Sequence, residues 1–272
     1  MNHNPLHLRS RMISRYEKRH DQLLDPCRLH RGSTLKNILC CACLAGAGLA
    51  LLLLAYCAAV VVTARRNTPR LMRDALSAEN ITLASAELPR RRLDQLLKVE
   101  DPGFLSHRGL DLKTPGAGLT TITQALVKIF YFKEFKPGFS KLRQTLIARY
   151  AMGQLVSKQD QLTLFLNYAY LGSCKGSEIR GFTAAAQCYY GKKVGRLKED
   201  EYLSLVAMLA SPATFSPVVN PQANKDRVAR IKKLVSGEYV PAHRMDIYYG
   251  PLDPYTQTAL APASYFETIY EN

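Results

Sequence analysis

Residues 100–128 contain the side chains best suited to chemistry. A carboxylate pair, Glu100 and Asp101, opens this stretch, a Gly- and Thr-rich loop follows at 116–121, and Lys128 closes it. Such a set can abstract a proton while it holds an anion, because glycines let the backbone approach a ligand and a threonine can cap the next helix. On spacing alone the plainer alternative stays open, with solvated carboxylates, a capping threonine and a surface lysine.

The elements that must position these groups are expected to be helices. Apolar residues within 122–130 recur at the spacing of one helical face. Residues 64–99 are interpreted as a linker and an approach helix, and residues 211–227 as an extended, Pro-punctuated segment. Further helices are expected over residues 142–150, 157–172, 181–191 and 201–210. Alternating runs typical of strands are nearly absent, so the predicted fold class is mainly α.

Length and charge bound the domain organisation. The chain has 272 residues and a formal net charge of +15, which predicts an anionic partner. Nucleic acid is disfavoured as that partner because no binding motif accompanies the charge. Four parts are predicted: a basic arm (1–37), a transmembrane helix (38–63), one globular domain (64–240) and a Pro- and Tyr-rich tail (241–272) that we expect to be poorly packed.

The prediction of a membrane anchor rests on the uncharged run of residues 38–63. A helix needs about 20 apolar residues to span a bilayer, and a cleaved signal peptide would have a shorter core nearer the N-terminus. The preceding arm carries more basic residues than the far flank does, which favours an N-terminus inside the cell and the domain outside.

The cysteines fall into two groups. Cys40, Cys41 and Cys43 lie at the inner edge of the anchor, where they are either acylated or small hydrophobic residues in lipid. Cys174 and Cys188 would face an oxidising compartment, but their separation along the chain does not decide whether they pair.

Five motifs, taken in order, resemble those of the family 51 peptidoglycan glycosyltransferases. The first is Glu-Asp-x-x-Phe-x-x-His-x-Gly over residues 100–109, and the second is Gly-x-Thr-Thr-Ile-Thr-Gln-x-x-x-Lys over 118–128. The others are Leu-x-x-x-Leu-Asn-x-x-x-x-Gly (162–172), Gly-x-x-x-Ala-Ala-x-x-Tyr-Tyr-Gly-Lys (181–192) and Ser-Pro…Asn-Pro…Arg (216–227). With one anchor and no downstream penicillin-binding domain, the chain resembles the monofunctional transglycosylases.

The resemblance implies a lysozyme-like, mostly helical fold that polymerises lipid II at the bacterial cytoplasmic membrane. Glu100 matches the base that takes a proton from the 4-hydroxyl of the acceptor sugar, which attacks the donor with inversion and displaces a lipid pyrophosphate. The implied partners are lipid II, the nascent glycan strand, the membrane and other cell-wall synthesis proteins. The implied substrate-binding residues are Asp101, His107, Thr120, Thr121, Gln124, Lys128, Lys141, Arg143, Gln144, Thr145 and Asn167.

One departure from the family's pattern concerns a divalent cation. The family's third motif carries a glutamate near the donor pyrophosphate and its Mg²⁺ or Mn²⁺, whereas this chain places Gln144 or Thr145 there, depending on the direction of counting. Neither is a carboxylate, so no metal ligand is assigned and a cation cofactor is in doubt. Three hypotheses follow: an active glycosyltransferase, a non-catalytic member that binds lipid II or partner enzymes, and a glycan hydrolase pairing Glu100 with Asp101 or Asp111.

Overall fold

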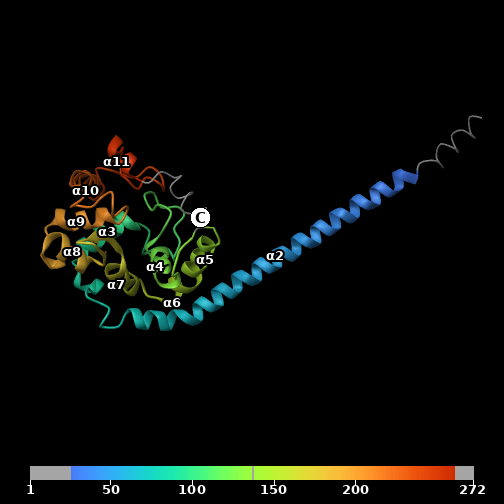
Figure 1. The fold of residues 1–272 in the computed structure, drawn as a ribbon, viewed down its shortest axis with the longest axis horizontal. Helices are drawn as coiled ribbons and strands as arrows, with labels where there is room; N and C mark the ends of the chain where they lie inside the picture. The colour runs from blue at the N-terminus through green and yellow to red at the C-terminus, as the bar shows by residue number, and fades with distance from the viewer. Residues whose placement is uncertain (1–25, 137, 261–272) are drawn as a thin grey trace, which may run out of the picture. The chain divides into compact units, whose positions relative to one another are not determined.

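The computed structural model describes residues 26–136 and 138–260 and is predominantly helical, as predicted (Figure 1). Most of the predicted basic arm and the end of the predicted tail lie outside the described residues. The helices are α2 (Pro26–Ala75), α3 (Arg90–Glu100), α4 (Ile122–Tyr131), α5 (Phe139–Ile147), α6 (Gly153–Leu155), α7 (Lys158–Tyr168), α8 (Phe182–Tyr190), α9 (Glu199–Met208), α10 (Pro221–Ser236) and α11 (Pro254–Ala259). A π-helical turn (Ala148–Met152) joins α5 to α6, and 3₁₀ turns lie at Ser85–Glu87 and Val194–Arg196.

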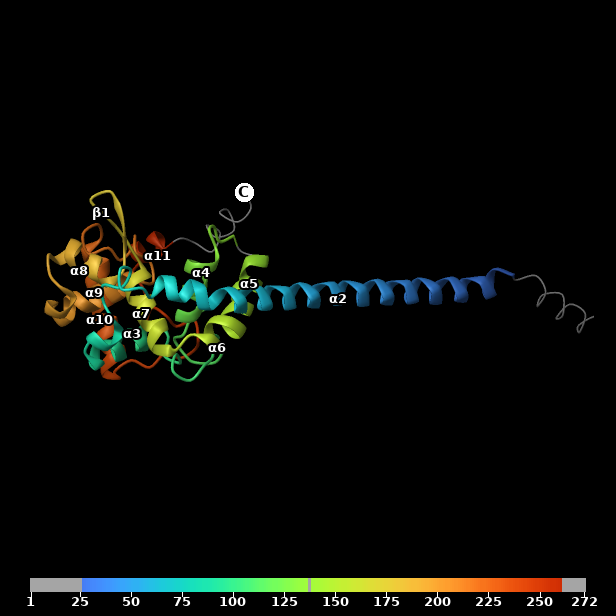
Figure 2. The ribbon, with the colours of Figure 1, turned by 90° about the horizontal axis from the view of Figure 1, so that it is seen from below.

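The globular part has two groups of helices with α7 between them. In two perpendicular views, α3, α8, α9 and α10 gather on one side, and α4, α5 and α6 gather on the other (Figures 1 and 2). Helix α7 packs against α4 and also contacts α8. Leu96 of α3, Leu126 of α4 and Leu164 of α7 are fully buried in one core. The ends of α3 and α4, where the predicted chemistry lies, are therefore fixed by a continuous apolar core.

Helix α2 contains a candidate membrane span. Its stretch Lys36–Ala75 is long and apolar enough to cross a bilayer, in agreement with the anchor predicted over 38–63. The linker predicted from residue 64 is instead helical as far as Ala75. Its inward side is held by the domain, because Ala64 and Met72 are buried and the Thr68 hydroxyl lies 2.5 Å from that of Tyr131.

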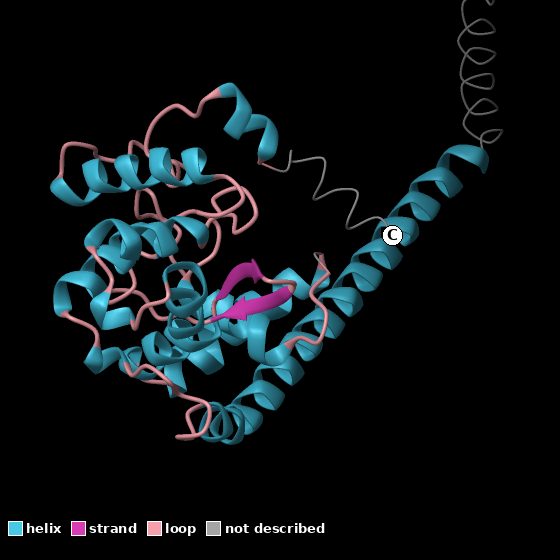
Figure 3. Cartoon of the chain, turned by 60° about the vertical axis from the view of Figure 1, so that its left-hand side comes forward, coloured by secondary structure: helices cyan, strands magenta, loops and turns pink. Residues whose placement is uncertain are grey.

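A short hairpin, β1 (Tyr170–Cys174) and β2 (Ser177–Arg180), was not predicted (Figure 3). The helix expected to run to Gly172 ends at Tyr168, and Gly172 has a φ of +86°, which suits glycine and not a helix. Cys174 and Cys188 form a disulfide that links the hairpin to α8. The pairing that the sequence left open is therefore present.

Two predicted irregular segments are ordered. Helix α10 begins at Pro221, inside the segment expected to be extended, because proline at the first helical position needs no amide donor. Residues 241–250, predicted to be poorly packed, contact the domain: Tyr249 is buried and its hydroxyl donates to the carbonyl of Val99 at 2.8 Å. The prediction of a poorly packed tail is therefore wrong for this segment. Its sequence has no apolar periodicity from which the packing could have been predicted.

We expect Cys174→Ser combined with Cys188→Ser to lower the free energy of unfolding by about 3 kcal/mol, because a cross-link that closes a loop of roughly 15 residues restricts the unfolded chain by that amount. Urea unfolding of the parent and the double variant in non-reducing buffer measures the difference. Added dithiothreitol should lower the unfolding midpoint of the parent to that of the double variant. Equal unfolding midpoints without reductant would contradict a native disulfide.

Candidate active site

Glu100 is the last residue of α3 and is half-buried. Burial raises the pKa of its carboxyl to about 7, Arg227 opposes that shift, and the neighbouring Asp101 adds to it. A carboxyl group with a pKa near 7 exchanges protons readily at neutral pH, which is the property required of a general base.

Arg227, from α10, supplies the positive charge that faces Glu100. Its side chain is almost fully buried, and its Nε donates to the carbonyl of Ala207 at 3.1 Å. The guanidinium lies 5.0 Å from the ring centre of Phe215 and 5.7 Å from that of Tyr249. Aromatic faces and backbone carbonyls thus hold a fixed cation beside the carboxylate without neutralising it.

Asp101, in contrast, has no free oxygen atom. It is fully buried, its Oδ1 lies 2.9 Å from Nε2 of His107, and its Oδ2 accepts from the amide of Ile122 at 3.0 Å. Nδ1 of His107 accepts from the amide of Gly109 at 3.0 Å, so Nε2 carries the proton that is given to Asp101. Both side chains thus tie the first motif to the start of α4, and the substrate contacts predicted for Asp101 and His107 stay a prediction.

The second motif is built around a capping box at the start of α4. Gln124 N–H donates to the hydroxyl of Thr121, and Thr121 N–H donates to Oε1 of Gln124, both at 3.1 Å. The Thr121 hydroxyl also donates to the carbonyl of Gly109 at 2.8 Å. The plainer interpretation, a helix cap, is therefore the one that the structure gives for Thr121 and Gln124, while Thr120 beside them is exposed.

An exposed group of cations lies farther along α4 and on α5. Lys128 and Arg143 are exposed, and Nζ of Lys141 donates weakly to the hydroxyl of Thr120 at 3.5 Å. Burial, with a contribution from Lys128, lowers the pKa of Lys141. Because like charges that lie close together repel, this group favours an anion between them. Lys128 lies about 9 Å along α4 from Ile122, at 1.5 Å per residue.

The structure separates the two candidates for the missing glutamate of the third motif. Gln144 is buried, and its Nε2 donates to the carbonyl of Gln124 at 2.8 Å across the contact between α5 and α4. Thr145 is half-buried and lies one helical turn beyond Lys141, on the same face of α5. Gln144 is therefore part of the contact between α5 and α4, whereas Thr145 is the more accessible of the two positions.

Asn167 was predicted to bind substrate, but its amide is fully used inside the domain. Its Oδ1 accepts from the amides of Thr82 and Leu83 at 2.9 and 3.2 Å. Its Nδ2 donates to the carbonyls of Leu83 and Thr163 at 2.8 and 2.7 Å. These bonds connect α7 to the segment that follows α2, which is a structural role.

A divalent cation does not fit the predicted pyrophosphate site. Neither α4 nor α5 contains an aspartate or glutamate, so the cation group has no carboxylate from these helices. Asp101, His107 and Asp111 do lie together, but the first two give their ligand atoms to the internal bonds described above. Helices α4 and α5 thus contribute cations to this group and no carboxylate metal ligand.

Two groups that the sequence analysis did not assign to the site lie close to it. Arg227 was recognised only as the end of the last motif. Lys158 places Nζ 3.9 Å from the ring centre of Phe104, and among the described residues this buried Nζ has no hydrogen-bond partner. Burial lowers the pKa of Lys158 to about 8, against the opposing effect of Asp101. Arg227 could have been identified as the last residue of the fifth motif, whereas Lys158 lies in none of the five motifs and had no signal in the sequence.

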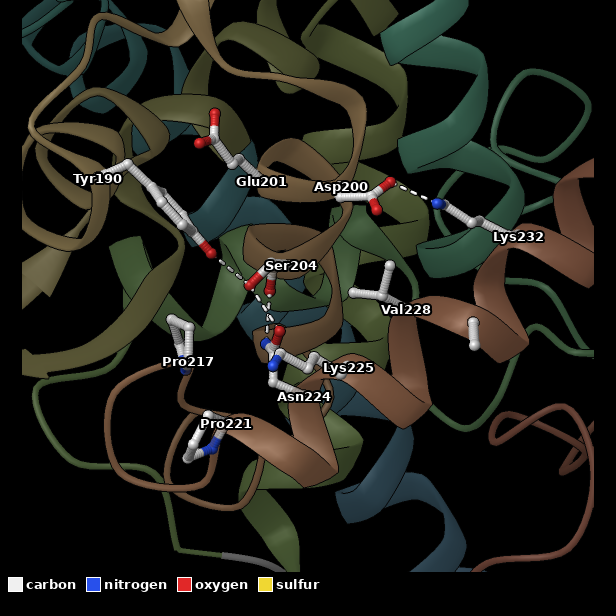
Figure 4. A pocket seen from close by; sticks show the side chains of 11 residues that line it. Tyr190, Asp200, Glu201, Ser204, Pro217, Pro221, Asn224, Lys225, Val228 and Lys232 are labelled. Atoms are coloured by element: carbon white, nitrogen blue, oxygen red, sulfur yellow. Dashed lines mark hydrogen bonds and ion pairs between the residues drawn. The ribbon is translucent and has the colours of Figure 1, made fainter.

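A separate cavity of about 450 Å³ opens between α9 and α10 (Figure 4). The hydroxyl of Tyr190 donates to Ser204 at 2.6 Å, and Ser204 donates to Asn224 at 2.7 Å. Lys232 pairs with Asp200 at the rim. None of the predicted site residues lines this cavity, and these polar groups are already bonded to one another, so it is not part of the site around Glu100.

Comparison with known proteins now identifies the family. The family model described as Transglycosylase matches residues 70–236, more than half of the chain. This chain belongs to the transglycosylase family. It is similar to penicillin-binding protein 1F of Bacillus subtilis, with 30% identity over 52% of this chain, and to penicillin-binding protein 1B of Escherichia coli, with 29% identity over 54%. Penicillin-binding protein 1A of Vibrio cholerae is 29% identical over 61% of the chain. The chain spans about a fifth of the length of each relative.

The range matched to the transglycosylase family contains Glu100, the cation group and Arg227. The family's model therefore covers both the carboxylate and the cation group described above. Residues 239–250, which contact the same site from outside that range, are not covered by it.

The environment of Glu100 predicts a cost to stability at neutral pH. A carboxyl whose pKa is raised on folding from 4.5 to about 7 destabilises the fold as the pH rises from about 4.5 to about 7, because the unfolded state loses its proton first. Glu100→Gln removes this penalty, so the variant should be more stable than the parent by about 3 kcal/mol at pH 8 and equal to it near pH 4. Urea unfolding at both pH values measures this, and a difference that does not depend on pH would contradict it.

Proposed function

We propose that this domain polymerises glycan strands from lipid II, as an inverting peptidoglycan glycosyltransferase. The observation that supports it most is the pairing of one half-buried carboxylate, Glu100, with an exposed phosphate-binding face that carries Lys128 and Lys141. Membership in the transglycosylase family supports the reaction class. The choice of lipid II and the stereochemistry come from the resemblance of the motifs.

In the proposed step, ionised Glu100 accepts the proton of the acceptor sugar's 4-hydroxyl. The oxygen then forms a bond to the donor's anomeric carbon, and the bond from that carbon to the phosphate oxygen breaks. The electron pair of the broken bond leaves with the lipid pyrophosphate. General-base assistance of this kind contributes about 10²–10⁴ in rate, and Arg227 keeps part of the Glu100 population ionised at neutral pH.

The departing pyrophosphate gains negative charge and needs stabilisation by fixed cations. Lys128 and Lys141 would supply it, with Arg143 nearby on α5 and the Thr120 hydroxyl as a further donor. A divalent cation would add to this charge stabilisation in the family, but the residues of α4 and α5 do not provide its ligands.

The proposed location is the bacterial cytoplasmic membrane, crossed once, with the N-terminus inside and the domain outside. The apolar length of α2 supports the membrane span. The disulfide between Cys174 and Cys188 supports an oxidising compartment for the domain. The proposed partners are lipid II, the nascent strand, acidic lipid and other cell-wall synthesis proteins, with no nucleic acid among them.

A second candidate function is lipid II binding without turnover, by the same domain. One specific observation favours it: both positions that could match the family's third-motif glutamate, Gln144 and Thr145, lack a carboxylate, and α5 contains no acidic residue. Binding of lipid II without measurable polymerisation, in both the parent and the restored variant described below, would support this alternative.

We expect Glu100→Gln to lower polymerisation of labelled lipid II by at least about 10²-fold, because the amide cannot accept the proton. For the parent, kcat/KM should rise with pH through an apparent pKa of about 7, the value set by the burial of Glu100. Gel analysis of glycan chains between pH 4 and 8.5 measures both effects.

The matched control for this experiment is Glu178→Gln, which removes an exposed carboxylate of β2 that pairs with Arg180. It should keep the parental rate and pH dependence. Parental polymerisation by Glu100→Gln would show that another group is the base, and an acid limb near pH 4.5 would show that Glu100 is solvated.

A glutamate introduced at position 145 should make the rate depend on metal, whereas one introduced at position 144 should not. Thr145→Glu places a carboxylate one turn from Lys141, so the rate should rise several-fold as Mg²⁺ is titrated, whereas the parent should respond little to Mg²⁺ or EDTA. Gln144→Glu should not do so, since it buries a charge next to the carbonyl of Gln124 and should destabilise the fold by about 1–3 kcal/mol.

Lipid II turnover and thermal unfolding of the parent, Thr145→Glu and Gln144→Glu separate these cases. Strong Mg²⁺ dependence of the parent, unimproved by Thr145→Glu, would contradict the metal-independent site.

A further inference from the structure

Residues 239–250, here called the C-terminal strap, run from the end of α10 back over the site. The strap is held together by Asp246, whose Oδ2 accepts from the hydroxyl of Tyr239 at 2.7 Å and from the amide of Ala242 at 3.0 Å. It is fixed to α10 by Arg230, whose Nε donates to the carbonyl of Tyr248 at 3.0 Å. These bonds give the strap one defined path across the domain.

The strap pairs with the backbone of the glycine-rich loop of the second motif. The amide of Gly116 donates to the carbonyl of His243 at 3.0 Å, and the amide of Gly118 donates to that of Arg244 at 2.8 Å. Gly118 has a φ of +66°, and a Cβ built on it would lie 3.2 Å from Cγ2 of Ile247. The loop and the strap therefore touch backbone to side chain, which only glycine permits here.

The other end of the strap reaches the helix that carries Glu100. The hydroxyl of Tyr249 donates to the carbonyl of Val99 at 2.8 Å, one residue before Glu100. Nη1 of Arg227 donates to the carbonyl of Ile247 at 3.2 Å. One short segment thus contacts the loop, the helix end and the buried cation of the same site.

These contacts support the site and leave it open. The strap covers the buried residues 116–118 of the loop, while Leu119 and Thr120, which follow, stay exposed. Lys128 is exposed as well. The face that would receive the substrate is thus free, so the strap braces the loop from behind and does not obstruct it.

We propose that the C-terminal strap is a positioning element for glycosyl transfer, with Tyr249 as its key positioning residue: it sets the end of α3 against the glycine-rich loop and excludes water from the side of Glu100 that faces Arg227. This inference rests on the proposed function. The strap lies beyond residues 70–236, the range that the transglycosylase family model matches.

The first test uses Tyr249→Phe, which keeps the ring over Arg227 and removes the bond to Val99, and Tyr249→Ala, which removes both. Both variants lose the hydrogen bond to the carbonyl of Val99. Its loss should lower kcat for lipid II polymerisation about five- to tenfold, with less than about a twofold change in KM. The groups that face Glu100 are Asp101, Arg227 and Tyr249. Water admitted by Tyr249→Ala should move the acid limb of kcat/KM below its parental value near pH 7.

The second test does not depend on turnover. Hydrogen exchange of the full-length protein in detergent should show slow amides at Gly116 and Gly118 that exchange at least about tenfold faster in Tyr249→Ala, while α9 stays protected. Tyr170→Phe is the matched control, since it removes a hydroxyl from an exposed tyrosine of β1, outside the strap. It should leave the kinetics, the acid limb and the exchange unchanged.

The outcomes separate the strap from the proposed function. If the parent and Thr145→Glu do not polymerise lipid II, the proposed function fails, and the exchange of Gly116 and Gly118 still decides whether the strap holds the loop. If the parent is active but the Tyr249 variants keep its kcat, acid limb and slow amides, the strap inference is wrong. A loss of activity that matches a lower unfolding temperature, with the acid limb unmoved, would also overturn it.

Discussion

The hydrogen bonds of one buried carboxylate, Asp101, hold the site in its shape. One carboxylate oxygen accepts a hydrogen bond from Nε2 of His107, and the other accepts one from the first amide of α4. At that helix end the helix dipole favours a negative charge. The end of α3 is thereby fixed to the start of α4, and the carboxylate pair is divided into a structural member and a chemical one. This link helps to set the position of Glu100 relative to the cation group on α4 and α5.

The same arrangement explains why Glu100 is held between ionised and protonated forms. Burial and the nearby Asp101 favour the proton, and Arg227 favours its loss, so the carboxyl is poised near neutral pH at the expense of folding free energy. Lys128 lies farther along α4, and Lys141 and Arg143 lie on α5; none of them is among the charges that shift the pKa of Glu100. The proposed base and the proposed phosphate-binding face are thus electrostatically separate within one small domain.

The sequence predicted the helical class and the candidate membrane span, because apolar periodicity and an uncharged run reflect packing and burial directly. It could not distinguish residues that touch a substrate from residues that hold the site together. Thr121, Gln124 and Asn167 carry polar groups suited to either role, and only their hydrogen-bond partners, distant in the chain, decide it. Tyr249 had no local pattern at all, since its burial depends on Arg227 and Val99, which lie far from it in sequence.

The central claim is that Glu100 is a desolvated base opposed by Arg227, and its titration tests this most directly. The protein labelled with ¹³C at the glutamate side-chain carboxyl, in detergent, should give one resonance that is absent from Glu100→Gln and titrates at about 7. Arg227→Lys should move that value, because a less rigid cation would face the carboxylate. A Glu100 resonance that titrates near 4.5, unaffected by the change at Arg227, would contradict the account.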